Sequence, residues 1–459
     1  MSAEKNEIGM DYTPDFEQLR ELLENRQLLA LKNTIAEMNE YDVSEFIEEL
    51  DSEKALLVFR LLQKDTASDV FAYLDSDKQE HIIKCTNDED LHDMIEELFV
   101  DDVVDLLEEL PASVVRRILQ NANPSKRKII NQFLKYPDSS AGSIMTVEYV
   151  ALKKAMTVKD AIEYIRKNGV DKETIYTCYV TDQRRQLEGV VTLKDLVMAA
   201  EDVVIEDIMD THVIKCITTD SQEDVARAFT DYDLLALPVV DHENRIVGIV
   251  TVDDAVDVIE EEATEDIEKM AAIIPSEKPY FKTGVIETWK KRIPWLMLLM
   301  ISATFTGMII NSYEEALKSV VILTSFIPML MDTGGNTGSQ ASVTVIRGLS
   351  LNEIEFKDIL KVIWKEIRVA FLCGISLAII SFVKVILVDN ADNILIPIIV
   401  ALTIFITVAI AKIIGCSLPM LAQKVGLDPA VMASPFITTI VDAVSLVIYF
   451  KIASTLLNF

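Results

Sequence analysis

Five long apolar runs near the end of the chain constrain its fold more than any other feature. They lie at residues 293–310, 319–346, 369–388, 394–421 and 430–450. Each is near or above the roughly 20 residues that a helix needs to cross a bilayer. The sequence therefore predicts a membrane domain of five helices over residues 283–459.

Basic residues flank these runs on one side. They precede the first run, lie between the second and third, and occur between the fourth and fifth: Lys282, Lys290, Lys291, Arg292, Arg347, Lys357, Lys361, Lys365, Arg368 and Lys424. The loops on the other side, "NSYEEALK" and "VDNADN", are poor in basic residues. Because basic loops stay in the cytoplasm, we expect a multi-pass protein of the cell membrane with a cytoplasmic N-terminus and an extracytoplasmic C-terminus.

The part before the membrane domain is strongly acidic. The whole chain carries a formal net charge of -31, whereas residues 283–459 hold 13 basic and 12 acidic residues. Essentially all the excess acid thus lies in residues 1–282. Phosphate groups need a basic surface, so we expect no nucleic-acid partner, and a cation suits this surface better.

Residues 1–136 contain a repeated motif. "EFIEELD", "DVFAYLD" and "DMIEELF" place Leu50, Leu74 and Leu98 at intervals of 24 residues, and "DLLEELP" follows at Leu110, half a period later. A fixed period of this size is typical of stacked helical hairpins, each of which buries its face on the next. The sequence therefore predicts an all-α superhelical N-terminal domain.

Residues 137–252 contain a second repeat of different character. Both copies begin with Ile-Met, in "SIMTVEYVAL" and "DIMDTHVIKC", and end in "GVVTLKDLV" or "GIVTVDDAV". Between these motifs the pattern predicts a strand, a helix, two strands and a helix. This order, present twice, resembles a tandem pair of CBS domains, which is an α/β unit.

The CBS resemblance implies an adenine-nucleotide pocket, with ATP as a candidate regulator. Thr192 and Asp195 would face the ribose, as would Thr251 and Asp254 in the second copy. The adenine-lining stretch would be Leu234, Leu235, Ala236 and Pro238. A Thr and an Asp at this spacing can equally cap the following helix. Thr177 also stands where nucleotide-binding relatives tend to place an aromatic ring, which weakens the expectation of ATP.

The second apolar run contains a polar stretch, "PMLMDTGGNTGSQ", at residues 328–340. Asp332, Asn336 and Gln340 recur there at near-helical spacing, and the glycines allow another helix to approach closely. Polar groups inside a membrane are costly and are functional candidates by default. Helix packing through small residues is the alternative explanation.

The fifth run carries one ionisable residue at mid-span. Asp442 follows Thr438 and Thr439 by one helical turn, and nothing in the same helix neutralises it. Such an Asp costs about 2.5–3.5 kcal/mol on insertion scales, unless it is protonated or satisfied by another helix. Mg²⁺ prefers carboxylate oxygens and keeps most of its waters. Because one Asp per chain is too few, we expect a homodimer with a pore near its two-fold axis.

Residues 253–282 are expected to form an acidic connecting helix. Its first part, "DDAVDVIEEEATEDIEKM", continues an apolar stripe at helical spacing: Val252, Val256, Ile259, Ala263, Ile267 and Met270. Acidic residues lie opposite, and like charges four residues apart repel each other by about 0.2–0.5 kcal/mol per pair. Divalent cations would supply the missing counter-charge. An ordinary solvated face is the alternative.

The membrane motifs and the domain order resemble the MgtE type of magnesium transporter. The shared motifs are Gly-Gly-Asn-x-Gly-x-Gln, Gly-Leu-Asp-Pro-Ala and Pro-Phe-x-Thr-Thr-x-x-Asp. The resemblance covers nearly the full chain and implies a homodimeric Mg²⁺ channel that closes when cytosolic Mg²⁺ binds. It implies that Asp442 binds the hydrated ion. The further pore-lining residues would be Asn336, Gly338, Thr438 and Thr439.

The same resemblance implies regulatory Mg²⁺ sites on the soluble domains. In this family the connecting helix lies under the pore as a plug, and Mg²⁺ holds it against the other soluble domains. The matching acidic residues are Asp254, Asp257, Glu262, Glu265 and Asp266 in the connecting helix, Glu223 and Asp233 in the CBS pair, and Asp69, Asp101 and Asp105 in the helical domain.

Two other functions remain open at this point. The oxygen-rich ligands favour hard ions but also suit a channel for another divalent cation, such as Mn²⁺ or Co²⁺. A CBS-type metal or nucleotide sensor anchored in the membrane is the other alternative, although an anchor needs no polar residues within its spans. The sequence contains no P-loop, His-based metal motif or nucleophile motif, so we do not expect an enzyme.

Overall fold

The computed structural model describes residues 15–276, 280–281, 283–389, 393–432 and 434–457. The chain divides into two compact units, Met1–Ile259 and Glu260–Phe459. The division falls within one continuous helix, α15 (Val252–Met270). The two units are described separately below, the first as the soluble unit and the second as the membrane unit.

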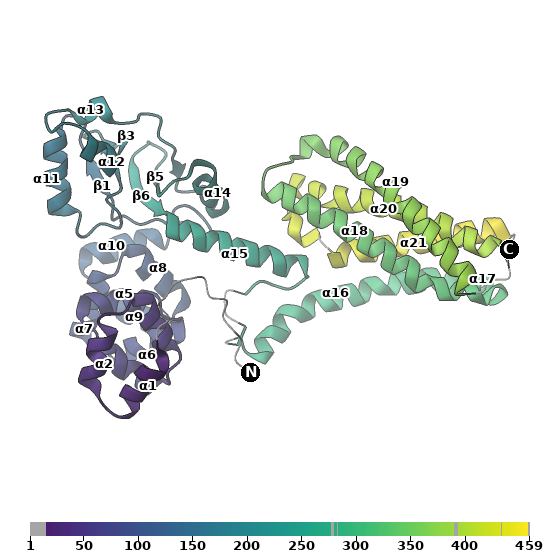
Figure 1. The fold of residues 1–459 in the computed structure, drawn as a ribbon, viewed down its shortest axis with the longest axis horizontal. Coiled ribbons are helices and arrows are strands. Elements are labelled where there is room, and N and C mark those ends of the chain that lie inside the picture. Colours follow the sequence, from purple (N-terminus) through teal and green to yellow (C-terminus); the bar gives the residue numbers. More distant parts are fainter. Residues whose placement is uncertain (1–14, 277–279, 282, 390–392, 433, 458–459) are drawn as a thin grey trace. The chain divides into compact units, whose positions relative to one another are not determined.

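Ten helices of eight to ten residues make up the first part of the soluble unit among the described residues (Figure 1). They are α1 (Phe16–Glu24), α2 (Leu28–Ile35), α3 (Glu40–Glu48), α4 (Ser52–Phe59), α5 (Lys64–Ala72), α6 (Ser76–Cys85), α7 (Asp88–Glu97), α8 (Val100–Glu109), α9 (Ala112–Asn121) and α10 (Pro124–Phe133). Each begins 12 residues after the previous one. The 24-residue repeat of the sequence is therefore one helical hairpin.

The leucines of the repeat lie just after the ends of helices and are buried. Leu50 follows α3, Leu74 follows α5, Leu98 follows α7 and Leu110 follows α8. Helix α3 contacts α5, α5 contacts α7, and α7 contacts α9, while α4 contacts α6. Like helices of successive hairpins thus stack on each other, as the repeat predicts.

Polar side chains mark the starts of several of these short helices. The side-chain oxygens of Asp15, Asn39, Asp51, Asn87 and Asn123 accept hydrogen bonds from backbone N–H groups of the first turn. Such caps satisfy donors that have no partner within the helix. The caps, together with the 12-residue spacing, explain why no helix here runs on into the next.

Two small α/β modules follow, in the order that the sequence predicts. The first contains β1 (Val150–Leu152), α11 (Val158–Asn168), β2 (Thr177–Thr181), β3 (Leu187–Thr192) and α12 (Leu193–Met198). After α13 (Ile205–Ile208), the second contains β4 (Cys216–Ile217), α14 (Gln222–Tyr232), β5 (Ala236–Val240), β6 (Ile246–Thr251) and then α15. In each module the first two strands are parallel, and the last two are antiparallel.

One hydrophobic core runs through the helical repeats and the second α/β module. Ile95, Val103 and Ile130 of the helices belong to the same buried cluster as Phe229 and Leu237 of the module. The first module has a separate core. A shared core holds residues of both segments at fixed positions, and it brings acidic side chains of α8 near the start of α15.

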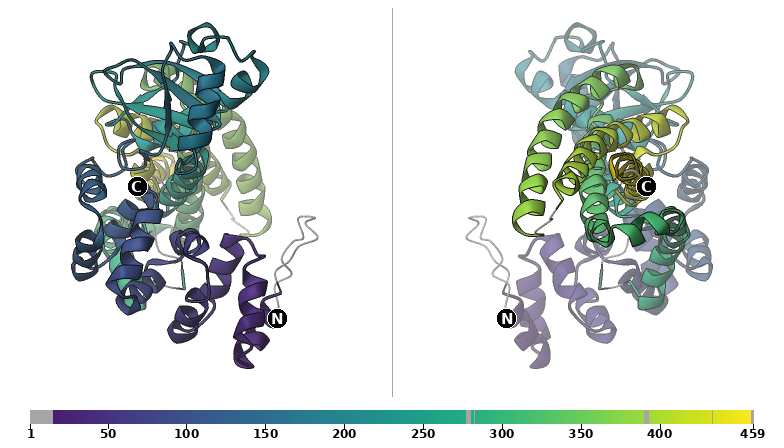
Figure 2. Two further views of the ribbon diagram at one scale, coloured as in Figure 1. Left: turned by 90° about the vertical axis from the view of Figure 1, so that its left-hand side faces the viewer. Right: turned by 90° about the vertical axis from the view of Figure 1, so that its right-hand side faces the viewer.

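The second unit is helical (Figures 1 and 2). Its elements are α16 (Val285–Ser312), α17 (Glu314–Ser319), the 3₁₀ turn η1 (Val321–Phe326), α18 (Ile327–Ser350), η2 (Phe356–Asp358), α19 (Ile359–Leu387), α20 (Leu395–Lys424), η3 (Pro429–Met432) and α21 (Ser434–Leu457). Helix α20 contacts α18, α19 and α21. It therefore forms the centre of the bundle.

Four stretches are long and apolar enough to cross a membrane among the described residues. They are Val285–Ser312, Phe356–Leu387, Leu395–Lys424 and Pro429–Leu457. Helix α18, where the second of the five predicted spans lies, has 24 residues. Because of its polar stretch, α18 is less apolar than these four stretches and is not among them. It packs against α20 and α21.

Glycines allow α18 to approach its neighbours closely. A Cβ at Gly415 of α20 would meet the carbonyl oxygen of Gly338 and would lie 3.1 Å from its Cα. A Cβ at Gly334 would lie 2.9 Å from side-chain atoms of Ser445, Thr407 and Val441. The predicted packing through small residues is therefore present, and it brings the polar stretch of α18 beside α21.

Candidate functional site

Asp442 of α21 lies against a glycine of α18. A Cβ at Gly335 would lie 3.7 Å from Asp442 Oδ1 and 2.9 Å from Thr438 Cγ2. Asp442 is half-buried, and Asp332 of α18 adds a second carboxylate near it. Two segments about 100 residues apart in the sequence, Gly-Gly-Asn of α18 and Thr-Thr-x-x-Asp of α21, thus meet at one place in the bundle.

The rest of the predicted pore residues divide into two groups. Asn336 is exposed on the surface of the unit, and its Nδ2 donates to Asp332 Oδ1 at 3.1 Å. Gly338 is buried, and a Cβ there would lie 2.8 Å from Ile437. The hydroxyls of Thr438 and Thr439 donate to the Pro435 carbonyl at 2.9 and 3.0 Å. Gly338 thus serves helix packing, and both threonine hydroxyls are bonded within their own helix.

A polar stripe runs along the exposed side of α18. Asp332, Asn336, Gln340, Thr344 and Arg347 are all exposed and recur at steps of three or four residues. Hydrocarbon provides no partners for such groups, so this side of α18 suits water or another protein surface better than lipid.

In the soluble unit, carboxylates from α8, α15 and the loop before β2 lie close together. Asp101 is buried, and its Oδ1 has no hydrogen-bond partner among the described residues. Burial, and then the neighbouring Asp102, raises the pKa of Asp101 well above its usual range. Burial is also the main cause that raises the pKa of Asp102 and of Asp254 to about 6.

Glu173 and Glu148 belong to the same cluster, although the sequence did not predict them as site residues. Burial, followed by the charges of Asp253 and Asp254, raises the pKa of Glu173 to about 8. Glu148 adds a further negative field to Asp101 and Glu173. Both residues lie in loops that are distant from the acidic helix in the sequence. No local sequence pattern therefore predicts that they join this cluster. We call Asp101, Asp102, Glu148, Glu173, Asp253 and Asp254 the acidic cluster.

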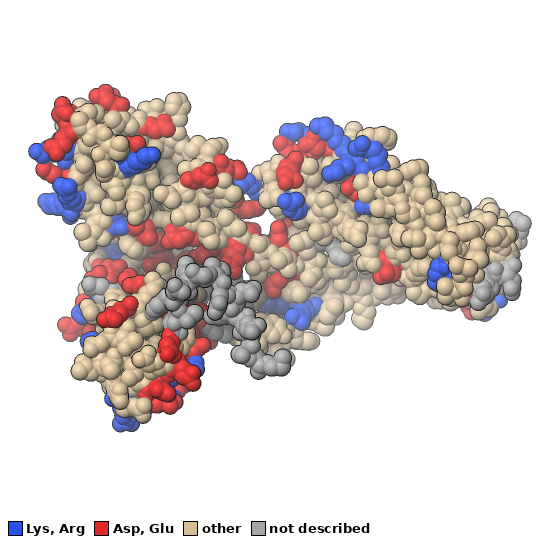
Figure 3. All heavy atoms as spheres, viewed as in Figure 1, with Lys and Arg blue, Asp and Glu red and all other residues tan. Residues whose placement is uncertain are grey.

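The other predicted regulatory residues are more dispersed. Asp69 and Asp105 are exposed. Glu223 pairs with Arg227 at 2.8 Å, and Asp233 ends α14 in the left-handed conformation with φ of 51°. Among the described residues, no three His, Cys, Asp or Glu side chains are arranged to hold a metal ion directly. A preformed cage is therefore not seen, and the acidic side chains shown in red in Figure 3 offer charge rather than a complete ligand set.

The second half of α15, from Glu260 onward, contacts α18 and the loop before α21, which belong to the same unit. Lys269 Nζ lies 2.7 Å from Asp428 Oδ2 in the Gly-Leu-Asp-Pro-Ala loop before α21. The Ser350 hydroxyl, at the end of α18, lies 3.4 Å from Asp266 Oδ2. Burial and then Asp428 raise the pKa of Asp266. The acidic helix thus touches both α18 and the loop that leads to Asp442.

Several residues of the apolar stripe of α15 are exposed, whereas Met270 at its end packs against Ile346 and Ala430. The exposed fractions are 55% for Val256, 46% for Ile259 and 64% for Ile267, whereas Ala255 and Val258 are buried. Asp254 and Asp266 on other sides of the helix are partly or largely covered. A helix normally turns its apolar side inward, so Val256, Ile259 and Ile267 form an exposed apolar surface that could contact another protein.

The predicted nucleotide residues lie at the start of α12 and around the start of β5. Thr192 and Asp195 form a capping box at α12, in which Asp195 N donates to Thr192 Oγ1 at 3.1 Å. Leu235 is exposed, Leu234 is half-buried, and Ala236 and Pro238 lie within buried strand β5. The Thr/Asp pair thus caps α12, as the alternative reading of its spacing predicts.

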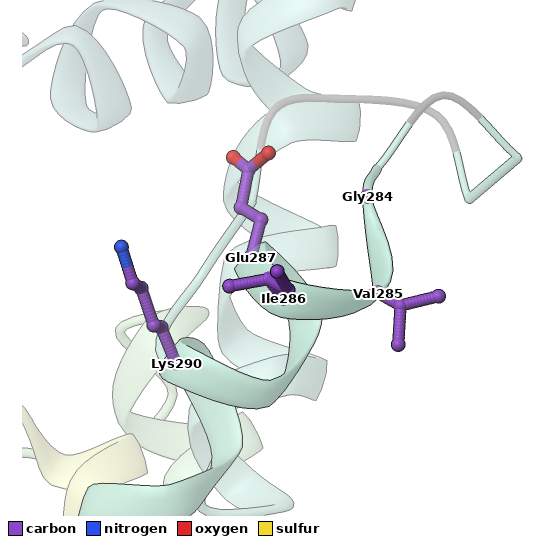
Figure 4. Close-up of a pocket in the computed structure, with 5 residues that line it drawn as sticks. All are labelled: Gly284, Val285, Ile286, Glu287 and Lys290. Atoms are coloured by element: carbon purple, nitrogen blue, oxygen red, sulfur yellow. The ribbon is translucent and has the colours of Figure 1, made fainter.

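A separate hollow of about 650 Å³ lies at the start of α16 and is shown in Figure 4. Gly284, Val285, Ile286, Glu287 and Lys290 line it, and the side chains of Glu287 and Lys290 extend away from Val285. It contains none of the predicted site residues. Its position, where the connecting segment enters the first long apolar helix, fits a membrane-interface segment.

The comparison with protein families matches most of this architecture, although α16 and α17 lie outside the matched residues. Residues 38–139 match the "MgtE intracellular N domain", residues 141–202 and 205–261 match the CBS domain, and residues 327–452 match the family described as "Divalent cation transporter". Together with the apolar helices, these matches define a membrane-spanning divalent cation transporter with CBS domains. Similar proteins of known name show which ion the family transports.

Magnesium transporters of the MgtE type are similar to this chain over almost its whole length. The Thermus thermophilus protein is 35% identical over 452 residues, which cover 96% of this chain and 98% of the relative. The Bacillus subtilis protein is 34% identical, with 95% and 96% covered. The chain belongs to the MgtE family of magnesium transporters. Since the relatives are named as transporters, the family is not an enzyme family.

Two solved structures are similar to the soluble unit. One, the soluble part of a magnesium transporter, is 34% identical with a TM-score of 0.51, covering 54% of this chain and 98% of that one. The other, the cytosolic domain of the Mg²⁺ channel MgtE in complex with ATP, is 36% identical with a TM-score of 0.50, covering 53% and 99%. These likenesses agree with the helical domain and the CBS pair.

Proposed function

We propose that this protein is a homodimeric, Mg²⁺-selective channel for magnesium uptake across the cell membrane, closed by Mg²⁺ on the cytosolic side. Its working parts would be the helical domain (1–136), the CBS pair (137–252), a connecting plug helix (253–282) and a five-helix pore domain (283–459). The observation that carries the proposal is the position of Asp442 against Gly335, beside the polar stripe of α18.

The path for the ion would be built from oxygen and amide groups. Asp442 would hold the hydrated ion, and Asn336 would contact its waters from α18. A carboxylate with several retained waters suits Mg²⁺, whereas a softer ion would gain from His or Cys ligands. The exposed polar stripe of α18 supports this path, because lipid would leave those groups without partners.

A second copy of the chain would complete the pore. One Asp442 per protomer gives one carboxylate, and a two-fold axis gives two. The exposed apolar stripe of α15, at Val256, Ile259 and Ile267, supports a protein partner for that helix. Unlike a lipid surface, a second α15 presents an identical stripe, which is what a two-fold contact requires.

The gate would be α15. Acidic residues at its start belong to the acidic cluster, and Asp266 and Lys269 near its end contact Ser350 and Asp428. Mg²⁺ bound at the cluster would offset the repulsion and favour the closed arrangement. An ion shifts such an equilibrium only by its different affinity for the two states, so several weak sites would give a steep response.

The proposed orientation places the soluble unit in the cytoplasm and the C-terminus outside. Support comes from the exposed basic residues at the end of α18 and the start of α19: Arg347, Lys357, Lys361, Lys365 and Arg368. Loops of this charge stay in the cytoplasm. ATP is a candidate regulator of the CBS pair, because a similar cytosolic domain was solved in complex with it.

Ion flux into liposomes tests the proposal. The full chain should take up Mg²⁺ at low internal Mg²⁺, and Asp442→Asn should lower the flux at least about a hundredfold, as loss of a key electrostatic group does. Asp358→Asn, which removes a carboxylate beside Lys361 at the start of α19, is the matched control and should leave flux unchanged. Unchanged flux in Asp442→Asn would exclude this pore.

The same preparation separates the alternatives. Equal or larger uptake of Mn²⁺ or Co²⁺ in competition with Mg²⁺ would make the protein a channel for another divalent ion. No uptake of any divalent ion by correctly folded protein would leave the membrane-anchored sensor.

A further inference from the structure

Two opposite charges are buried within the membrane unit, away from Asp442 in the sequence. Lys412 Nζ of α20 lies 3.0 Å from Glu366 Oε2 of α19. The side chains are 7% and 10% exposed, respectively. Both residues lie inside stretches that are long and apolar enough to cross a membrane.

This ion pair is one of several contacts between α19 and α20. The two helices already contact each other through Phe405, which would lie 2.9 Å from a Cβ at Gly374 and whose ring meets that of Phe371 at 6.0 Å. Removing two charges from water is expensive, and apolar residues of similar volume are often as stable or more stable. Charged residues at membrane depth accordingly suggest a role in function.

The pair lines an open hollow of about 720 Å³ together with the polar stripe of α18. Asn336, Ser339, Gln340 and Thr344 contribute amide and hydroxyl groups to this hollow. Glu366 and Lys412 are the two charged residues among those that line it. The hollow thus shares Asn336 with the proposed ion path. The net charge of its wall depends on whether the Glu366 carboxylate neutralises the Lys412 ammonium.

We propose that Glu366 determines ion permeation by neutralising Lys412 in the wall of the ion path. Without the carboxylate, the Lys412 ammonium would present one positive charge beside Asn336. Coulomb repulsion scales with the product of the charges, so a dication would meet twice the barrier that a monovalent cation meets. The inference rests on the proposed function, because it assumes that the ion passes Asn336.

Three variants of the full chain in liposomes test this role: Glu366→Gln, Lys412→Gln and the double variant. Glu366→Gln should lower Mg²⁺ flux about tenfold and K⁺ flux in Mg²⁺-free buffer only about threefold, because the barrier scales with ion charge. The double variant has neither charge and should recover Mg²⁺ flux to within about threefold of the parent. Lys412→Gln should lower the Mg²⁺ concentration that gives half-maximal flux.

A purely structural clamp predicts the opposite pattern. The double variant would then be at least as impaired as Glu366→Gln, and Mg²⁺ and K⁺ fluxes would fall by the same factor; either result overturns the proposal. Gel filtration in detergent shows whether Glu366→Gln folds. If it does not, Lys412→Gln tests the proposal alone. A Mg²⁺ concentration for half-maximal flux that is unchanged or higher than in the parent then overturns the proposal.

Asp442→Asn distinguishes this inference from the proposed function. Lost Mg²⁺ flux in Asp442→Asn together with parental behaviour in Glu366→Gln would leave the pore assignment intact and remove only the role of the pair.

Discussion

Lys269 at the end of the acidic helix forms an ion pair with Asp428, 2.7 Å away, in the loop that leads to α21. Lys269 also lies 2.5 Å from Glu265 of its own helix. Asp266 stands nearby, with its hydrogen bond to Ser350. One ammonium group therefore offsets the repulsion between two acidic residues of α15 and one of the loop.

Lys269→Met should loosen the end of α15. The carboxylates left behind repel each other, and a partly buried pair of this kind is worth about 1 kcal/mol, or about fivefold in the population of the detached state. We expect protease cleavage within residues 260–276 to rise by about that factor at millimolar Mg²⁺. If α15 is the proposed gate, Mg²⁺ flux should also persist at internal Mg²⁺ concentrations that stop flux through the parent chain.

Lys318→Met is the matched control for this experiment. It breaks an exposed ion pair with Glu314 at 2.6 Å, and exposed pairs contribute little. Equal cleavage of Lys269→Met and the parent chain would show that the Asp428 contact does not hold the helix.

The acidic cluster should make the soluble unit less stable as pH rises, unless Mg²⁺ is present. Glu173 and Asp254 have folded-state pKa values of about 8 and about 6, both raised from their ordinary values of 4.5 and 3.8. The folded unit binds these protons more tightly than the unfolded chain. Their stabilising contribution is therefore full below about pH 4 and is lost as pH rises through 6 to 8.

Glu173→Gln tests this dependence. It should raise the free energy of unfolding of the soluble unit at pH 8 without Mg²⁺ by on the order of 1 kcal/mol, the worth of about one pKa unit. The measurement is pulse proteolysis of the full chain in urea at pH 5 to 8, with and without Mg²⁺. Mg²⁺ should flatten the pH dependence of the parent. Exposed Glu163→Gln is the control, and an identical response of both variants would contradict the prediction.

Gly415→Ala should disrupt the packing of α18 on α20. The added methyl group would meet the carbonyl oxygen of Gly338, which is a backbone atom and not the end of a flexible side chain. Overpacking of this kind typically costs about 1–3 kcal/mol, so the thermal transition in detergent should fall by several degrees. Gly307→Ala is the control because a Cβ there has no neighbour within 4 Å. A transition unchanged in both variants would refute the close contact.

Val256→Asp should weaken the homodimer if the exposed stripe of α15 is its contact surface. A buried, unpaired charge in such a contact should raise the dimer dissociation constant at least about tenfold. Light scattering in detergent gives the mass of the complex. Val170→Asp places the same charge at a side chain that is 84% exposed, and its dimer should match the parent. A fully dimeric Val256→Asp would place the contact elsewhere.

The elements set by local pattern could be predicted, and the contacts set by long loops could not. Buried leucines every 24 residues define the hairpins, and the strand–helix–strand–strand–helix order reappears in both α/β modules. In contrast, Glu173 joins the acidic cluster from a loop, and Glu366 and Lys412 are 46 residues apart. Charges that meet only through tertiary packing leave no periodic signal in the sequence.

The sequence also did not predict which side of α15 faces its neighbours. Its stripe and acidic residues were apparent from helical spacing, but periodicity does not say which side faces a neighbour. In the structure Ala255 and Val258 face inward, while Val256 and Ile259 are exposed. Similarly, Gly338 matches a pore position of the family by motif, yet its place is in the tight contact between helices.

Because α15 is one unbroken helix of 19 residues, its two ends are coupled in rotation as well as in position. Each residue of a helix turns the chain by about 100°, from 3.6 residues per turn. A single residue inserted between Ile259 and Glu260 would rotate Asp266 and Lys269 by that angle relative to Asp254. An insertion of seven residues would nearly restore their angular relation, at a greater length. The angular phase of this helix, and not only its charge, thus relates its acidic start to the end that carries Asp266 and Lys269.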